Sequence, residues 1–293
     1  MVPLHTFRAE TNAMTTPEAV IASYLEHIQD EAYIEAALAR HGAAALVDAA
    51  VRLVRSLETE QFNDAVLFIR DVSTGIFPKK ITLGFRAQLP GSGLFDALDR
   101  CLRAPSFHLR SQAAYTFGKL GYPENAERLI HVLEKRRDID PLLTPQLLFE
   151  IRWLTDDEEA HWRRIEWLAE APEGVCRWAA LQAIEGTAPC PPGAPIDALL
   201  ATLQHDCFEA IRADATSLQE TLRLRTAGTH QAAQTTAGHT PLTFSDLSIR
   251  FWHHHAAADY TPADLLAFLA TQTVSPQDGH VARGVQGTQV QLS

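Results

Sequence analysis

The sequence lacks the long apolar runs that form membrane-spanning helices. It also lacks the clustered positive charge that binds nucleic acids. No stretch reaches the roughly 18 consecutive apolar residues that a membrane-spanning helix needs. The formal net charge is −11, from 25 Lys and Arg against 36 Asp and Glu. Phosphate affinity and attraction to anionic lipids both depend on concentrated Lys and Arg. The composition therefore disfavours nucleic-acid and membrane partners.

Cysteine and lysine are equally scarce, with four of each. The four cysteines, at positions 101, 176, 190 and 207, form no Cys-x-x-Cys pair, so a zinc site is not expected and a reducing compartment is. The first 16 residues contain Glu10 and no apolar segment, which argues against a secretory signal. We expect a cytoplasmic protein. Four lysines against 21 arginines indicate a GC-rich bacterial gene.

Recognisable catalytic motifs are missing too. There is no Gly-x-Ser-x-Gly, no glycine-rich phosphate loop and no His-Glu-x-x-His. The run His253–His255, near Asp259, cannot converge on one ion because its members are consecutive. The acids from Asp156 to Glu159 follow Thr155 and predict a helix start, where carboxylates cap and complement the dipole. We therefore predict no catalytic residues, metal or cofactor, and favour a non-enzyme.

What the sequence does contain is a repeat. Its clearest copy runs from Leu109 to Leu133, as an Arg, an Ala-Ala pair, an apolar residue, a glycine turn and a second amphipathic helix. The segment 175–186 repeats the first helix, and 210–215 repeats its start. Arg110, Arg177 and Arg212 mark the copies, with Thr144 at the intervening position. One such helix pair cannot bury its apolar faces alone, so the copies must stack.

These units resemble HEAT repeats, in the short form of phycobilin-lyase-like bacterial proteins. The resemblance covers residues 94–225 and rests on the following positions: Arg110, Ala113, Ala114, Phe117, Gly118, Leu120, Gly121, Pro123, Ala126, Leu129 and Leu133. It implies an all-α fold, a right-handed α-solenoid of antiparallel helix pairs. It also implies an Asp–Arg ladder between repeats, here partial, because Asp206 stands six residues before Arg212 whereas Ala104 and Ala171 fill the corresponding places.

Two other repeat families were compared with the pattern. The period of 33 to 35 is close to that of tetratricopeptide repeats, but their Trp, Leu-Gly and Tyr pattern does not recur in register. The ankyrin-like Thr240-Pro241-Leu242 occurs once and outside the array. Tetratricopeptide repeats remain the second choice, and ankyrin repeats are excluded.

The chain is expected to divide around this array. We predict a flexible N-terminus (1–15), a helical cap of degenerate repeats (16–93) with an irregular insertion at 75–93 that includes a short hairpin near Ile81–Leu83, and the repeats (94–225). A linker (226–241) and an irregular C-terminal extension (242–293) with one helix and a disordered tail complete the chain.

Four of the five tryptophans lie between residues 153 and 178. Aligning the second helices on Leu133, Leu168 and Leu203 places Arg164 at a core position and Trp162 and Trp167 off that face. Trp153 and Trp178 lie on first helices, which line the concave side of a solenoid. Beside Arg152 and Arg177 they are predicted to form an aromatic and basic binding patch, the alternative being that they fill gaps in the core.

The favoured function is a protein–protein interaction scaffold whose concave face binds another protein. One alternative is an enzyme resembling HEAT-like DNA glycosylases, echoed only by Trp153, Asp156 and Trp178. The other is a bilin lyase or bilin-binding chaperone, which the short repeat form implies without any residue that identifies a pigment site.

Overall fold

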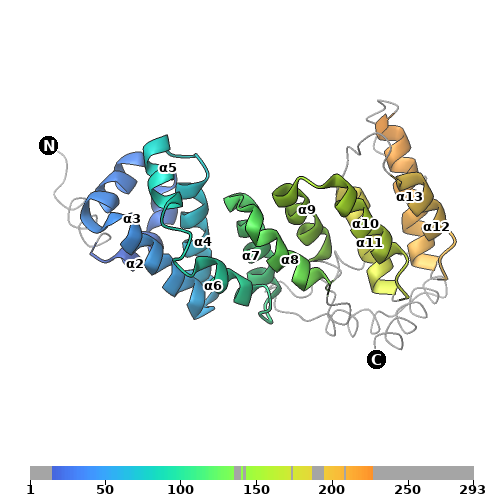
Figure 1. The fold of residues 1–293 in the computed structure, drawn as a ribbon, viewed down its shortest axis with the longest axis horizontal. Coiled ribbons are helices and arrows are strands. Elements are labelled where there is room, and N and C mark those ends of the chain that lie inside the picture. Colours follow the sequence, from blue (N-terminus) through green and yellow to red (C-terminus); the bar gives the residue numbers. More distant parts are fainter. Residues whose placement is uncertain are drawn as a thin grey trace. The chain divides into compact units, whose positions relative to one another are not determined.

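A computed structural model of the chain describes residues 15–134, 140, 143–172, 174–186, 195–207 and 209–226 (Figure 1). Within these ranges every regular element is a helix, so the all-α prediction is confirmed. Two elements are short 3-10 helices, Tyr24–His27 and Pro123–Asn125. The others are α2 (Pro17–Ala22), α3 (Glu31–Ser56), α4 (Thr59–Ser73), α5 (Lys79–Arg86), α6 (Leu94–Cys101), α7 (Phe107–Leu120), α8 (Ala126–Leu133), α9 (Thr144–Thr155), α10 (Glu158–Ala169), α11 (Gly174–Gly186), α12 (Ile196–Leu203) and α13 (Glu209–Thr226). The N-terminal segment, the linker beyond Thr226 and the C-terminal extension lie outside the described residues.

The chain divides into two compact units. The first comprises the residues up to Ala104 together with His108–Arg128, and the second comprises Pro105–Phe107 and the residues from Leu129 onward. The division falls within the range 94–225. Within the described residues, no helix combines the length and the apolar character needed to cross a bilayer.

The first unit begins with helices α2 to α4. Thr16 caps α2 by accepting a hydrogen bond from the backbone N–H of Ala19, with Pro17 in the first turn. Gly42 interrupts α3 by adopting a positive φ of 77°. The buried apolar face of α4 includes Phe62, Ala65, Val66, Ile69 and Val72. The buried side chains of these helices form a large part of the core of this unit.

The expectation of an irregular insertion at 75–93, with a hairpin near Ile81–Leu83, is wrong. Residues Lys79–Arg86 form helix α5 instead. Ile81 and Phe85 lie one helical turn apart and are both buried, and the Phe85 ring meets Phe68 of α4 edge-on at 5.6 Å. The glycines and prolines lie mostly in the turns on either side of this helix. Between those turns, the four-residue spacing of Ile81 and Phe85 is that of a helix.

The second unit is built from helix pairs. Helices α9 and α10 are joined by only Asp156 and Asp157, and α11 packs against both of them (Figure 1). Helix α13 packs in turn against α11 and α12, and α12 contacts α10. First helices thus contact first helices, and second helices contact second helices, along the chain.

The repeat arginine plays the same local role in each copy. Arg110, Arg177 and Arg212 each begin the second turn of a helix, respectively α7, α11 and α13. The Nη1 of each donates to the backbone carbonyl six residues earlier, at 2.8 Å to Ala104, 2.7 Å to Ala171 and 2.6 Å to Asp206. Because the acceptor is a backbone oxygen, alanine serves there as well as aspartate.

Where threonine replaces the arginine, a hydrogen bond spans four residues instead of six. Thr144, the first residue of α9, donates its hydroxyl to the carbonyl of Asp140 at 2.8 Å. All four marker positions thus lie in the first four residues of a helix, the three arginines at the fourth residue and Thr144 at the first.

Candidate interaction surface on helix α9

Helix α9 exposes two large aromatic side chains. Trp153 is 69% exposed and Phe149, four residues earlier, is 51% exposed. Residues four apart lie on the same face of a helix, so the two rings form one apolar strip. The opposite side of α9 is buried through Leu147, Leu148 and Ile151. Trp153 is among the predicted binding residues and Phe149 is not, although the four-residue spacing between them is visible in the sequence.

Arg152 does not give this strip a basic character. Its Nε donates to Oε2 of Glu158 at 2.5 Å, and Oε1 of Glu158 accepts from the indole N–H of Trp162 at 2.9 Å. The acids that follow Trp153 in the chain, Asp156, Asp157 and Glu159, are exposed. The surface at the end of α9 is therefore aromatic and acidic, not aromatic and basic as predicted.

Trp178 is not part of any surface, and its assignment to a binding patch is wrong. Its side chain is fully buried, at 0% exposure. The reason is the place of α11, which packs against α9, α10, α12 and α13. The residues aligned with it, Ser111, Pro145 and Ala213, are smaller and half-buried. The same burial removes Trp178 from the three positions that echo a glycosylase.

Arg177 is likewise engaged in the fold. Its side chain is 11% exposed and that of Asp206 is 3% exposed. The Nε and Nη2 atoms of Arg177 donate to the two carboxylate oxygens of Asp206, at 2.5 and 3.2 Å. This pair joins α11 to the turn that precedes α13. Its guanidinium is therefore a structural group.

The remaining tryptophans also differ from expectation. Trp162, expected off the core face, is 6% exposed and packs edge-on against His161 at 5.4 Å. Trp167 is half-buried, and so is Arg164, at the position where a core residue was expected. Of the four predicted binding residues, only Trp153 and Arg152 remain together near the surface.

The acidic cluster acts as predicted, at helix ends. Asp157 accepts a hydrogen bond from the backbone N–H of Ala160 at 2.8 Å and caps α10, and Asp156 ends α9 with a positive φ of 51°. Glu158 and Glu159 occupy the first turn of α10. No group of three metal-ligating side chains occurs in the part of the chain that the structure describes. Cys190 and His253–His255 lie outside it.

His161, beneath this surface, makes stability depend on pH. Burial, and then the charge of Arg152, lower its pKa from 6.5 to about 4. The unfolded chain takes up a proton near pH 6.5 while the folded chain remains neutral until about pH 4. Stability is therefore complete above pH 6.5 and falls between these values, by about 2–3 kcal/mol at pH 4.5.

The measurement is urea unfolding at pH 7.5 and pH 4.5 for the wild type and for His161→Leu. His161→Leu removes this titration, while the other ionisable groups continue to titrate. The free energy of unfolding of the variant should therefore fall by about 2–3 kcal/mol less than that of the wild type between pH 7.5 and pH 4.5. If the free energy of unfolding fell equally in both proteins, the His161 imidazole would be protonated at pH 4.5 in the folded state as well as in the unfolded one.

Comparisons with known proteins give no family. No protein-family model matches the chain, and no curated protein matches it. Among solved structures, the crystal structure of an engineered protein is similar, with 15% identity and a TM-score of 0.35. That match covers 95% of this chain and 65% of the other, so the chain spans slightly less than two thirds of the engineered protein's length.

Proposed function

We propose that the chain is a HEAT-like right-handed α-solenoid that works as a non-enzymatic scaffold and binds another protein through α9. The observation that carries the proposal is the exposed pair Phe149 and Trp153, 51% and 69% accessible on one helix face. An indole exposed to this extent gains little from folding, whereas burial at an interface removes a large apolar area from water. Tryptophan is also among the residues that contribute most to binding energy.

The repeat architecture is supported by two observations. Three first helices share the arginine-to-carbonyl hydrogen bond across six residues. Within the second unit, α9, α11 and α13 contact one another in succession, and so do α10 and α12. Stacked pairs of this kind leave one side of the first helices open to a partner.

The charge around the aromatic pair indicates the chemistry of the partner. Asp156 and Asp157 follow Trp153 in the chain and are exposed, and the whole chain carries a net charge of −11. Arg152, the nearest cation in sequence, is neutralised by Glu158. The partner we propose is a protein segment that combines apolar with basic side chains, in which an arginine stacks on the Trp153 indole.

The test compares capture by the wild-type chain, by Trp153→Ala and by Phe149→Ala in extracts of the source cells. Leu83→Ala is the matched control, since Leu83 is 53% exposed in the other unit. We expect a protein that is retained by the wild type and by Leu83→Ala and is lost by both α9 variants. A peptide from its basic segment should then bind the purified chain at least about 10-fold more weakly after Trp153→Ala.

Salt provides the second criterion. Binding should weaken as NaCl rises from about 50 to 500 mM, because exposed charges are screened over these concentrations. Capture that does not depend on Trp153 and Phe149, or a peptide affinity that does not change with salt, contradicts the proposal.

A further inference from the structure

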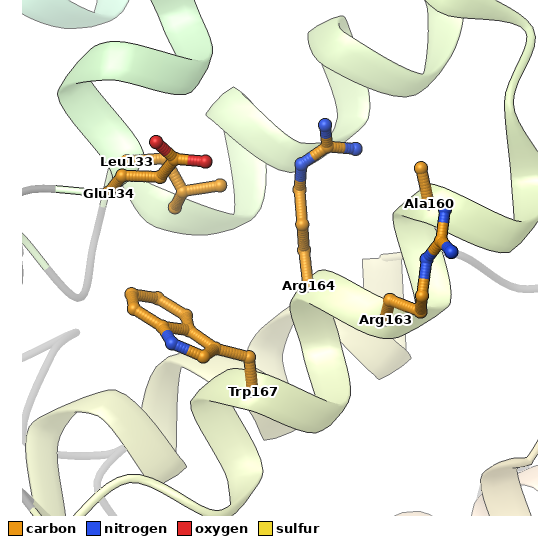
Figure 2. Close-up of a pocket in the computed structure, with 6 residues that line it drawn as sticks. All are labelled: Leu133, Glu134, Ala160, Arg163, Arg164 and Trp167. Carbon is orange, nitrogen blue, oxygen red and sulfur yellow. The ribbon is translucent and has the colours of Figure 1, made fainter.

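A cavity of about 450 Å³ lies in the second unit, between the end of α8 and helix α10 (Figure 2). Its lining is Leu133, Glu134, Ala160, Arg163, Arg164 and Trp167. Figure 2 shows the Glu134 carboxylate and the Arg164 guanidinium reaching into the space between the helices, with the Trp167 indole beside them. The volume is in the range of small-molecule sites.

Arg164 is an unexpected residue at this place in the repeat. In the alignment of second helices it corresponds to Leu129 and Leu199, which are 0% and 7% exposed. Its Nη1 atom is buried and donates no hydrogen bond. Among the described residues, no carboxylate forms an ion pair with it. Arg164 as a whole is half-buried, but a guanidinium nitrogen enclosed without a hydrogen-bond acceptor costs stability, so a leucine would serve the fold at least as well.

The other two charged residues of the cavity, Arg163 and Glu134, are more exposed than Arg164. Arg163 is 63% exposed and lies 3.4 Å from the Glu159 carboxylate. Glu134 is exposed on the wall formed by the end of α8. Two guanidinium groups and one carboxylate give the lining a formal charge of +1, which suits a single negative charge on a ligand. The indole of Trp167 and the side chains of Leu133 and Ala160 add apolar surface.

We propose that this cavity binds a small organic monoanion, a carboxylate attached to a planar apolar body. The carboxylate pairs with the guanidinium of Arg164, whose planar fork matches two carboxylate oxygens. The planar body packs on the Trp167 indole and on Leu133. Glu134 repels a second negative charge, so monocarboxylates bind in preference to dianions such as phosphate. The site lies on second helices and is independent of the surface on α9.

The test uses 2-naphthoate as the probe and neutral 2-naphthalenemethanol as its matched control, with binding measured by calorimetry on the full chain. We expect a Kd for 2-naphthoate below about 1 mM and binding of the alcohol at least about 10-fold weaker. Arg164→Leu should remove the preference for the anion, and Glu134→Gln should strengthen anion binding. Arg163→Leu, which changes the charge equally, should weaken it by less than about 3-fold.

Thermal melting separates binding from folding. Because leucine occupies the sister positions, Arg164→Leu should melt at the wild-type temperature or above it. A lower melting temperature would assign Arg164 a structural role and overturn the proposal. So would any of three binding results: no saturation by 2-naphthoate at about 10 mM, inorganic phosphate binding as tightly as 2-naphthoate, or equal losses in Arg163→Leu and Arg164→Leu.

Discussion

Replacing Trp178 with alanine is expected to lower the free energy of unfolding by about 3–5 kcal/mol. The side chain is fully buried in α11, the helix that packs against both neighbouring helix pairs. Truncation to alanine removes the transfer energy of the indole and leaves a cavity that the surrounding helices can close only in part. Chemical denaturation of the wild type and of Trp178→Ala measures the difference.

Trp153→Ala is the control for this measurement, because it deletes the same side chain from a position that is 69% exposed. We expect its free energy of unfolding to change by no more than about 0.5 kcal/mol. If the two variants lost similar stability, burial would not distinguish these tryptophans, and Trp153 would have to be regarded as a packing residue as well.

The helices in this part of the chain were predictable because their sequence signal is periodic and redundant. Each copy specifies an arginine, a small pair such as Ala113 and Ala114, and an apolar residue such as Phe117, so the loss of one marker at Thr144 does not hide the register. Helix α5 was missed because glycines and prolines around it suggested a loop, while its own signal rests on Ile81 and Phe85 alone. A segment of eight residues offers too few turns for the period to prevail over its surroundings.

The candidate site was less predictable, since side-chain exposure depends on neighbours far along the chain. Trp153 and Trp178 both lie on first helices and both follow an arginine, yet one is 69% and the other 0% exposed. The difference arises from the helices packed around α11. Likewise, no local pattern shows that Glu158 neutralises Arg152 or that Asp206 binds Arg177. Phe149 is the exception, because its four-residue spacing from Trp153 is visible in the sequence.

Replacing Asp206 with alanine is expected to destabilise the second unit by about 3 kcal/mol. The carboxylate is 3% exposed, and its removal leaves the guanidinium of Arg177 inside the fold without a counter-charge. Breaking a buried pair from one side costs about 3–5 kcal/mol. The lower end applies because Arg177 keeps its bonds to the carbonyls of Ala171 and Pro172. The bond from Arg212 is also retained, since it ends on the backbone oxygen of Asp206.

A double-mutant cycle in urea identifies the source of this loss. In the Arg177→Leu background the carboxylate has already lost its cation, so Asp206→Ala should cost much less there, and the coupling energy between the two residues should be about 1–3 kcal/mol. Asp206→Asn keeps the side-chain shape and one acceptor oxygen but removes the charge, so its loss should fall between those of the wild type and alanine. Additive losses would mean that Asp206 stabilises the turn before α13 by itself, and that its ion pair with Arg177 contributes nothing to the free energy of unfolding. A large coupling would instead identify this pair as a specific polar link between α11 and the turn that precedes α13, since a carboxylate and a guanidinium held by two hydrogen bonds fix one relative position of these two segments.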